Sequence, residues 1–443
     1  MISLKTVHEK LSNIKETSST NAKVALLTEY LTDKKFKHVI KLMYDDSKHF
    51  KVNKLSKFSG SPVNSLFMEE NLFKFLDKLA NQKGATNVDK DQLSELASID
   101  KETYEVVRKI INKDAKCGIG GKSINKAYPN LVFLMPYCRC HTQKKMGNIN
   151  YSQGAFAQEK ADGMFVNVII DKKGGVLLRS RNGNVVHQLD HLNKFLEKTP
   201  KKYRNAVYMG ELLIEKNGKI LPRKTGNGIL NSCIQNTADP KDSKCAIIKL
   251  WDATPYDQFF AGKSEIAYKY RFIRVKKFIN KMGDKQLLGQ IRSKIVYSLE
   301  EAETFYHKLR NEGKEGAIVK NLIAKWKDHT SPDMIKMKNV SDIELRITGW
   351  RYGKEDTRFA KCMGSVQLES DDGFIKVSVS GFKDDEHFDI DWDARIGKVA
   401  TLEFEGLITD KSRPGIYSLY LPRNLELRPD RSNTDTLKDV KRR

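Results

Sequence analysis

Hydrophobic residues in the first third of the chain are spaced as they are in helices. In DKETYEVVRKIINKDAKCG, Tyr104, Val107 and Ile111 recur three or four residues apart and therefore fall on one helix face. Asp100 is a suitable N-cap for this helix, and Gly118 is a suitable stop. The spacing predicts an all-α region over residues 1–140.

From about residue 150 the apolar residues alternate with polar ones, a period typical of strands. MFVNVII and GVLLRSR flank the turn sequence Asp171–Gly175, and further β-rich segments are AIIKLWDA, GAIVKN and MIKMK. Helical patterns such as YKYRFIRVKKFINKM lie between these segments. Residues 150–341 are therefore predicted to form an α+β domain.

Short strands dominate the predicted structure of residues 342–443. SVQLES, FIKVSVSG and KVATLEFEGL have strand patterns, and Asp371–Gly373 is a hairpin signal. These segments predict a small β-barrel of about five strands. The tail RSNTDTLKDVKRR is expected to be frayed. The whole chain is thus predicted to be a multidomain α+β protein.

Length and charge narrow the class of protein. The chain has 443 residues, enough for roughly three domains. Its 79 Lys and Arg against 56 Asp and Glu give a formal net charge of +23. Such an excess favours a polyanionic partner, most often nucleic acid, over the alternative of a merely solubilising surface.

The cysteines and the apolar runs indicate the cellular compartment. Six cysteines are scattered through a long chain, so free thiols are expected rather than a disulfide framework. Cys138-Arg139-Cys140-His141 resembles part of a zinc site, but no second cysteine pair follows at the spacing of a zinc finger. Free thiols are therefore favoured over a zinc site here as well. No apolar run suggests a signal sequence or a membrane span. A cytoplasmic location is expected.

Lys160 lies in AQEKADGMF, with the apolar segments GAFA before it and MFVNVII after it. A lone Lys-x-Asp-Gly is a weak signal, because a lysine at a strand end usually extends its ammonium group into water. Here, however, further motifs follow in order: SRNGN at 180–184, GEL at 210–212, LWD at 250–252, KEGAIVK at 314–320 and IKMK at 335–338. Several lie on or beside β segments, so their polar side chains are expected to converge on one cleft.

This ordered set resembles the motifs of ATP-dependent DNA ligases of double-stranded DNA bacteriophages, within the covalent nucleotidyltransferase superfamily. The resemblance covers nearly the whole chain. It implies that Lys160 is adenylated by ATP, that AMP passes to the 5′-phosphate of a nick, and that the 3′-hydroxyl displaces AMP, in DNA replication, repair and recombination. It also implies a helical DNA-binding domain (1–140), an adenylation domain (150–341), an OB-fold (342–443), and a monomer acting on nicked double-stranded DNA.

The chemistry of the motif residues fits this implied reaction. Lysine is a nucleophile only when neutral, and apolar surroundings or nearby cations disfavour its charged form. Trp251 offers a flat face for adenine, with a core tryptophan as the alternative. The resemblance implies that Mg²⁺, or Mn²⁺, is held by Glu211 and Glu315, and that Asp162, Gly163 and Lys320 complete the site. It implies nucleotide contacts from Glu159, Lys160, Arg181, Glu211, Trp251, Lys336 and Lys338.

The flanking regions resemble the same ligases. INKDAKCGIGGKSINKAYPNL resembles the end of their DNA-binding domain, which implies DNA contacts from Gly118, Gly120 and Lys122, together with Arg181. Alternatively, this segment is an ordinary helix C-cap followed by a loop, with no role in DNA binding. SLYLPRNLELRPDR resembles the end of their OB domain, and Arg428, Asp430 and Arg431 match a terminal motif that orients pyrophosphate. The family usually has Lys where Arg431 stands.

Two residues depart from the family pattern. Phe165 stands five places after Lys160, where the family usually has Arg, and Met209 stands where it usually has Asp. Relative to the family pattern, one positive and one negative charge are missing, so the net charge of the pocket need not change. We hypothesise that the two replacements compensate for each other. An RNA ligase, a capping-type guanylyltransferase and a non-catalytic DNA-binding protein remain alternatives.

Overall fold

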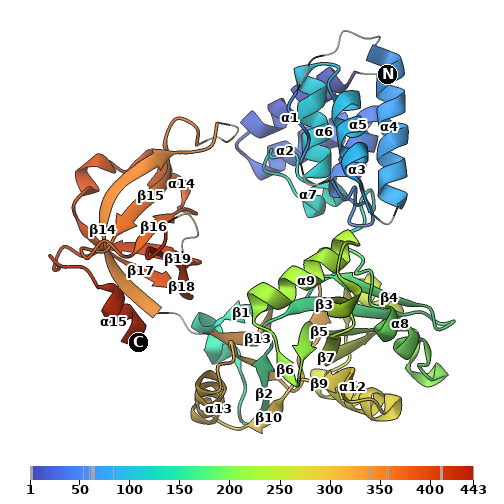
Figure 1. The fold of residues 1–443 in the computed structure, drawn as a ribbon, viewed down its shortest axis with the longest axis vertical. Coiled ribbons are helices and arrows are strands. Elements are labelled where there is room, and N and C mark those ends of the chain that lie inside the picture. Colours follow the sequence, from blue (N-terminus) through green and yellow to red (C-terminus); the bar gives the residue numbers. More distant parts are fainter. Residues whose placement is uncertain are drawn as a thin grey trace. The chain divides into compact units, whose positions relative to one another are not determined.

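The computed structural model describes residues 3–52, 54–58, 60, 65–82, 84–338, 341–355, 357, 359–409 and 413–442. It divides into two compact units, Met1–Met337 and Lys338–Arg443. Figure 1 shows the elements of both units. No helix in the described part of the chain is long and apolar enough to cross a membrane.

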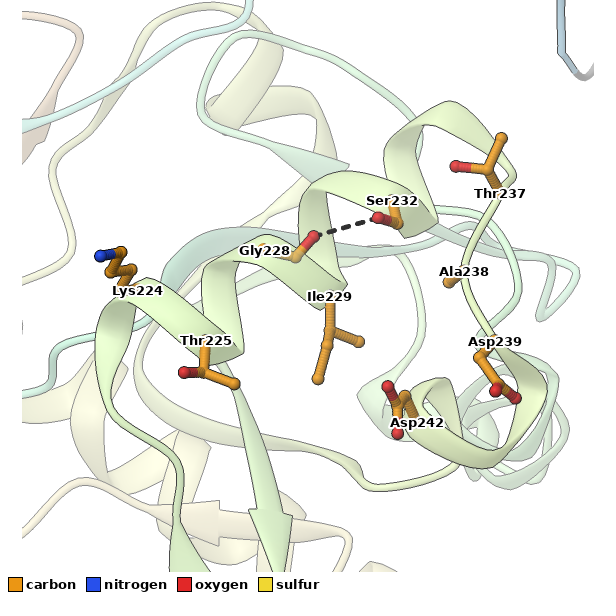
Figure 2. A pocket seen from close by; sticks show the side chains of 9 residues that line it. All are labelled: Lys224, Thr225, Gly228, Ile229, Ser232, Thr237, Ala238, Asp239 and Asp242. Atoms are coloured by element: carbon orange, nitrogen blue, oxygen red, sulfur yellow. Dashed lines mark hydrogen bonds between the residues drawn. The ribbon is translucent and has the colours of Figure 1, made fainter. Parts of the chain in front are cut away.

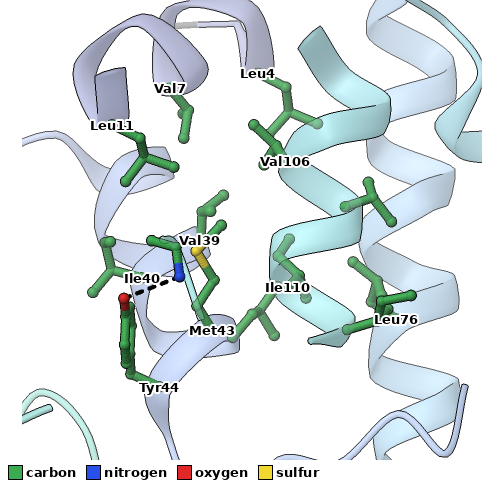
Figure 3. Packing of buried hydrophobic residues seen from close by; sticks show 14 of the residues in the cluster. Leu4, Val7, Leu11, Val39, Ile40, Met43, Tyr44, Leu76, Val106 and Ile110 are labelled. Atoms are coloured by element: carbon green, nitrogen blue, oxygen red, sulfur yellow. Dashed lines mark hydrogen bonds between the residues drawn. The ribbon is translucent and has the colours of Figure 1, made fainter. Parts of the chain in front are cut away.

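The described residues before the first strand form helices and loops. The helices are α1 (Leu4–Glu16), α2 (Thr20–Tyr30), α3 (Lys34–Tyr44), α4 (Ser65–Asn81), α5 (Asn87–Ala97), α6 (Lys101–Ile111) and α7 (Gly121–Ala127). Their apolar stripes face one core. On α1 the buried residues are Leu4, Val7, Leu11 and Ile14, which have helical spacing. Figure 3 shows Leu4, Val7 and Leu11 of this stripe with Val106 and Ile110 of α6 in the same core.

Helix α6 begins where the sequence predicts but ends earlier. Asp100 is its N-cap, and the Asp100 carboxylate accepts a hydrogen bond from the Thr103 N–H. The predicted stop at Gly118 was wrong, because the helix ends at Ile111. Lys113 has a φ of 57°, a left-handed conformation that an α-helix cannot continue through.

Two sheets form the β part of the first unit. One has the order β1 (Arg139–Thr142), β13 (Thr330–Lys338), β11 (Gly316–Asn321), β2 (Ala155–Lys160) and β10 (Ser293–Val296). The other has the order β4 (Val176–Ser180), β3 (Met164–Ile170), β5 (Ala206–Lys216), β7 (Ala246–Pro255) and β9 (Leu288–Gln290), with β6 (Lys219–Ile220) beside β5. A short ribbon pairs β8 (Lys263–Ser264) with β12 (Trp326–Lys327).

Helices pack on both sheets. They are α8 (Asp190–Glu197), α9 (Arg223–Gln235), α10 (Pro240–Ser243), α11 (Tyr256–Phe260), α12 (Tyr268–Met282) and α13 (Leu299–Asn311). Helix α12 covers β7 and β9 with Val275, Phe278 and Ile279, and α13 packs on β2, β10 and β11. The strands predicted at MFVNVII and GAIVKN and the helix predicted at YKYRFIRVKKFINKM are confirmed as β3, β11 and α12.

The second unit contains an antiparallel sheet of five strands. Its order is β16 (Lys376–Val379), β15 (Met363–Glu369), β14 (Ser341–Tyr352), β17 (Val399–Phe404) and β20 (Arg423–Leu427). The ribbon of β18 (Gly406–Thr409) and β19 (Tyr417–Tyr420) and the helices α14 (Asp384–Phe388) and α15 (Leu437–Arg442) complete the unit. The predicted hairpin at Asp371–Gly373 is confirmed, since it joins β15 to β16.

The prediction of a frayed C-terminal tail was wrong. The Asp435 carboxylate accepts the backbone N–H of Glu344 on β14, and the Leu437 N–H donates to Asp372. Val440 on α15 is only 8% exposed and joins the core of the second unit. Because its polar side chains satisfy backbone groups of the sheet, this charged segment is held in place.

A buried ion pair joins α12 to β7. The Arg271 guanidinium donates from Nε and Nη2 to the two carboxylate oxygens of Asp252, at 2.8 and 3.1 Å, and both side chains are almost fully buried. Arg271 also donates to the backbone carbonyl of Ala324. Removal of one partner therefore leaves a charge without compensation inside the protein.

We expect Asp252→Asn to lower the free energy of unfolding by about 3 kcal/mol, because Arg271 remains buried and charged. Glu265→Gln is the control, since the Glu265–Lys325 pair has side chains that are 63% and 55% exposed. It should cost no more than about 0.5 kcal/mol. Urea denaturation followed by tryptophan fluorescence measures both changes, and equal losses in the two variants would contradict the prediction.

Candidate active site

Lys160 lies where the chain passes from one sheet to the other. It is the last residue of β2, and β3 of the other sheet begins at Met164. Residues 161–163, here named the crossing loop, join the two strands. The Lys160 side chain is 22% exposed, so its ammonium group lies largely within the protein while part of it remains accessible.

Strand register brings Glu315 to this lysine. Strands β2 and β11 are antiparallel neighbours, and Lys160 pairs with Gly316, the first residue of β11. Glu315 immediately precedes that strand, and its Oε2 lies 2.5 Å from Lys160 Nζ. The carboxylate is 17% exposed, so the pair is shielded from most of the solvent.

Three contacts hold the crossing loop. The Gly163 N–H donates to Glu211 Oε1 over 3.1 Å, and the Gly163 carbonyl accepts from Asn227 Nδ2 over 3.1 Å. Arg223 Nη1 donates to Asp162 Oδ1 over 2.9 Å. A side chain at Gly163 would place its Cβ 2.3 Å from the Leu212 carbonyl oxygen, so only glycine fits there.

Glu211 is the most strongly perturbed acid of the site. Burial raises the pKa of its carboxyl group to about 8, although Lys160 and the Gly163 N–H favour the charged form. Glu315 adds to the rise, which shows that the two carboxyl groups interact. A bound dication would relieve both the burial cost and this repulsion, so the pair fits a hard metal such as Mg²⁺.

Lysines lie on the strands beside Lys160. Lys320 is in β11 and Lys336 is in β13, its neighbour in the sheet. Burial raises the pKa of the Cys140 thiol, while Lys320, Lys160 and Lys336 all act to lower it, so all three ammonium groups lie within electrostatic range of this thiol. Lys320 is 3% exposed, and burial lowers its pKa. The convergence of these cations on the nucleotide stays a prediction.

An aromatic series crosses the site. Trp251 on β7 lies 5.8 Å from Phe165, ring centre to ring centre, and Phe165 meets Tyr137 edge-on at 4.9 Å. The guanidinium of Arg181 lies 4.4 Å from the centre of the Tyr137 ring. Phe165 and Met209 belong to one apolar cluster, so the two departures from the family pattern occupy the same core.

Glu159 and its neighbours form the edge of the site. Arg292 Nε donates to Glu159 Oε2 over 3.2 Å, and Lys314 Nζ lies 3.9 Å from Oε1. The Tyr268 hydroxyl oxygen lies 2.7 Å from both Gln158 Oε1 and the Trp251 carbonyl, and Lys320 Nζ donates to it over 3.2 Å. These bonds fix the spacing between β2, β7 and β11.

Other predicted residues belong to the second unit. Lys338 belongs to the second unit, where its ammonium donates to both carboxylate oxygens of Glu405 at 2.8 and 2.7 Å. In the same unit Arg428 pairs with Asp430 at 2.7 Å and with Glu344, and Arg431 pairs with Glu344 at 2.7 Å. The structure therefore shows these residues only in contacts within their own unit.

The predicted DNA-contacting residues near α7 have local partners. Gly118 has a φ of +72°, and a Cβ there would lie 2.7 Å from Lys23 Nζ, so the conformation requires glycine. Gly120 is the N-cap of α7 and has open space beside it. Lys122 Nζ lies 3.2 Å from Asp328 Oδ2. Their contact with DNA stays a prediction.

Helix α9 separates the crossing loop from a pocket of about 330 Å³. Figure 2 shows that Thr225, Gly228 and Ser232 line this pocket from α9, with Asp239 and Asp242 opposite. Arg223 and Asn227 contact the crossing loop instead, and the spacing of a helix puts them on the other face. The pocket is thus not the space around Lys160.

Within the described ranges, no group of three or more His, Cys, Asp and Glu side chains is arranged as a complete metal site. The predicted Glu211 and Glu315 supply two carboxyl groups. Mg²⁺ commonly takes one or two carboxylates and completes its shell with water and substrate phosphates. The residues therefore fit a metal that binds together with a nucleotide.

Sequence reasoning missed several residues of the site: Tyr137, Gln158, Arg223, Asn227 and Tyr268. Most are polar residues in segments without a recognised motif, and only the fold brings them to Lys160. A signal existed for α9, because the sequence RKTGNG follows a strand and begins a helix with two cations.

Comparison with known proteins decides the family. Residues 137–338 match the ATP dependent DNA ligase domain, and they include Lys160, Glu211, Trp251 and Glu315. Residues 137–338 therefore form an ATP-dependent DNA ligase domain. The DNA ligases of Enterobacteria phages T4 and T6 are each 28% identical to this ligase over 480 residues, which cover 97% of each chain.

A solved structure supports the fold of the ligase over almost its full length. The structure named Pmar-Lig_Pre superposes with a TM-score of 0.72 and 20% identity, covering 96% of this chain and 99% of that chain. A second, Pmar-Lig_PreS3, superposes with a TM-score of 0.70. The protein is an enzyme that uses ATP to join DNA, so the ordered motifs predicted the family correctly.

The raised pKa of Glu211 makes the stability of the metal-free ligase depend on pH. The folded state holds the Glu211 proton up to about pH 8, whereas the unfolded chain releases it near 4.5, so stability falls as pH rises between these values. Glu211→Gln should abolish this contribution of Glu211 to the pH dependence of stability. We expect the wild-type melting temperature to fall by about 5 °C more than that of the variant between pH 5 and pH 9.

Thermal unfolding at a series of pH values, in EDTA, measures this difference. Glu215→Gln, on the same strand, is the matched control and should follow the wild type. Parallel curves for wild type and Glu211→Gln would show that Glu211 ionises in the folded protein as it does in the unfolded chain.

Proposed function

We propose that this ligase seals nicks with a 5′-phosphate and a 3′-hydroxyl in duplex DNA, and that Lys160 carries AMP between the two. The observation that carries the proposal is the contact between Lys160 Nζ and Glu315 at the crossing loop, with Glu211 beside it. The DNA ligases of phages T4 and T6, similar over their whole length, support duplex DNA as the substrate.

In the first step, Lys160 attacks the α-phosphorus of ATP. A P–N bond forms, the bond to pyrophosphate breaks, and the ammonium group has already lost one proton. Glu315, 2.5 Å away, is placed to accept that proton. The cations Lys320 and Lys336 stabilise the charge on the phosphate as pyrophosphate leaves.

Two further transfers use the same pocket. An oxygen of the 5′-phosphate attacks the AMP phosphorus, and the P–N bond breaks as Lys160 takes up a proton. The 3′-hydroxyl then loses its proton and attacks the 5′-phosphorus, and AMP leaves. The partly exposed crossing loop gives the DNA end access to Lys160 while β2 keeps the lysine in position.

The nucleotide occupies the space between Trp251 and the lysines. Trp251 stacks on adenine, and Glu159 and Glu211 lie within the region proposed for nucleotide contacts. Arg181 and Asp162 line the side where the DNA end enters. Bound Mg²⁺, or Mn²⁺, would be held by Glu211 and Glu315 and would neutralise charge on the phosphates.

The remaining regions bind and position DNA. We assign DNA binding to residues 1–140, adenylation to residues 150–341 and an OB-fold to residues 342–443. Gly118, Gly120 and Lys122 contact phosphates, and Lys338, Arg428, Asp430 and Arg431 act in adenylation after the second unit reorients. The enzyme acts as a monomer in the cytoplasm. The five-stranded antiparallel sheet of the second unit supports the OB-fold assignment.

Labelling with α-labelled ATP and Mg²⁺, followed by addition of a 5′-phosphorylated nicked duplex, tests the proposal. The wild type should become labelled and should lose the label as the nick is sealed, whereas Lys160→Ala should show at least a thousandfold loss of labelling. GTP and a nicked RNA duplex are the controls.

Labelling of Lys160→Ala at the wild-type level would refute the role of this lysine. Label that is discharged only on RNA strands would instead make the protein an RNA ligase, an alternative that Phe165 favours.

A further inference from the structure

The guanidinium group of Arg223 contacts the crossing loop. Arg223 is the first residue of α9, and its Nη1 donates to Asp162 Oδ1 over 2.9 Å. The two side chains are 48% and 43% exposed, so the pair lies at the open edge of the site. Its charge also opposes the rise of the Glu211 pKa, so the guanidinium lies within electrostatic range of this carboxyl group.

The helix holds this guanidinium in a fixed place. Asn227, one turn after Arg223, donates to the Gly163 carbonyl, and Leu230, a further turn on, is fully buried in the core. Arg223, Asn227 and Leu230 therefore share one face of a 13-residue helix that is anchored to the crossing loop. The backbone of Arg223 is therefore held at the crossing loop unless α9 itself moves.

The second transfer brings a second phosphate to the site, which favours a cation at the crossing loop in addition to Arg181, whose guanidinium lies over the Tyr137 ring. A 5′-phosphate must come within about 3 Å of the adenylated phosphorus, so two anions meet. Lys320 and Lys336 lie on β11 and β13, within the sheet that also holds Lys160, and neither lies on the crossing loop. Phe165 carries no charge, and its ring is enclosed by Tyr137 and Trp251. The crossing loop itself offers Asp162, which repels phosphate.

We propose that Arg223 binds the 5′-phosphate at the nick, exchanging the Asp162 carboxylate for the phosphate when DNA arrives. An exposed ion pair contributes little stability, because water screens it. A phosphate group accepts two parallel hydrogen bonds from a guanidinium and carries more charge than one carboxylate. In the free enzyme Asp162 keeps Arg223 oriented toward the loop. This inference rests on the proposed function and specifies how that site recognises the DNA end.

The affinities for nicked duplexes that carry either a 5′-phosphate or a 5′-hydroxyl test the proposal in the absence of the ligation reaction. Fluorescence anisotropy in EDTA gives both affinities for the full-length enzyme. The wild type should prefer the phosphate about tenfold. Arg223→Ala should reduce the preference to less than twofold, Arg223→Lys should keep part of it, and Lys224→Ala, at the next position of α9, should keep all of it.

Labelling by ATP separates this role from a structural one. Arg223→Ala and Arg223→Gln should each reduce self-adenylation by a much smaller factor than the phosphate preference, and Lys224→Ala should leave self-adenylation unchanged. An undiminished phosphate preference in Arg223→Ala would overturn the proposal. So would an equal loss of self-adenylation and phosphate preference, which would show that Arg223 only supports the loop.

The outcome also distinguishes this proposal from the proposed function. A wild type that takes up label from ATP and seals nicks, but binds both duplexes equally, would leave the function intact and refute the role of Arg223. A wild type that takes up no label would refute the lysyl-AMP function itself.

Discussion

The antiparallel pairing of β2 with β11 is the constraint on which the site depends. It sets Lys160 opposite Gly316 and therefore brings Glu315 to within 2.5 Å of the lysine ammonium group. Side chains alternate between the two faces of a sheet, so a shift of one residue would move Lys160 to the face that it does not now occupy. Ala155 and Ala157 of β2 are fully buried and fix this register.

The second constraint is the low polarity around a group of charges. Burial raises the pKa of Glu211 to about 8, and Lys320 is buried beside Tyr268 and Trp251. Charges placed in such surroundings interact strongly with any phosphate or dication that enters. The same burial that destabilises the free site therefore favours the binding of a metal nucleotide.

Much of this arrangement could be predicted from the sequence. The alternation of MFVNVII and GAIVKN identified β3 and β11, and the order of short motifs identified Lys160, Glu211 and Glu315. These features are local, because each depends on a few consecutive residues. The N-cap at Asp100 was predictable for the same reason.

The features that sequence reasoning missed depend on tertiary contacts. Arg223 and Asn227 meet the crossing loop only because α9 packs on β5. The C-terminal tail reads as polar and frayed, yet Asp435 satisfies a backbone N–H of β14. No spacing in the sequence reports these contacts, since their partners lie some 60 to 90 residues apart along the chain.

The central claim is that one lysine, held at the end of β2, carries the nucleotide. The most direct measurement is to incubate the protein with ATP and Mg²⁺, digest it, and locate the added AMP by tandem mass spectrometry. The account predicts a single AMP on the peptide that contains Lys160. AMP on Lys320, Lys336 or any other residue, with Lys160 unmodified, would contradict it.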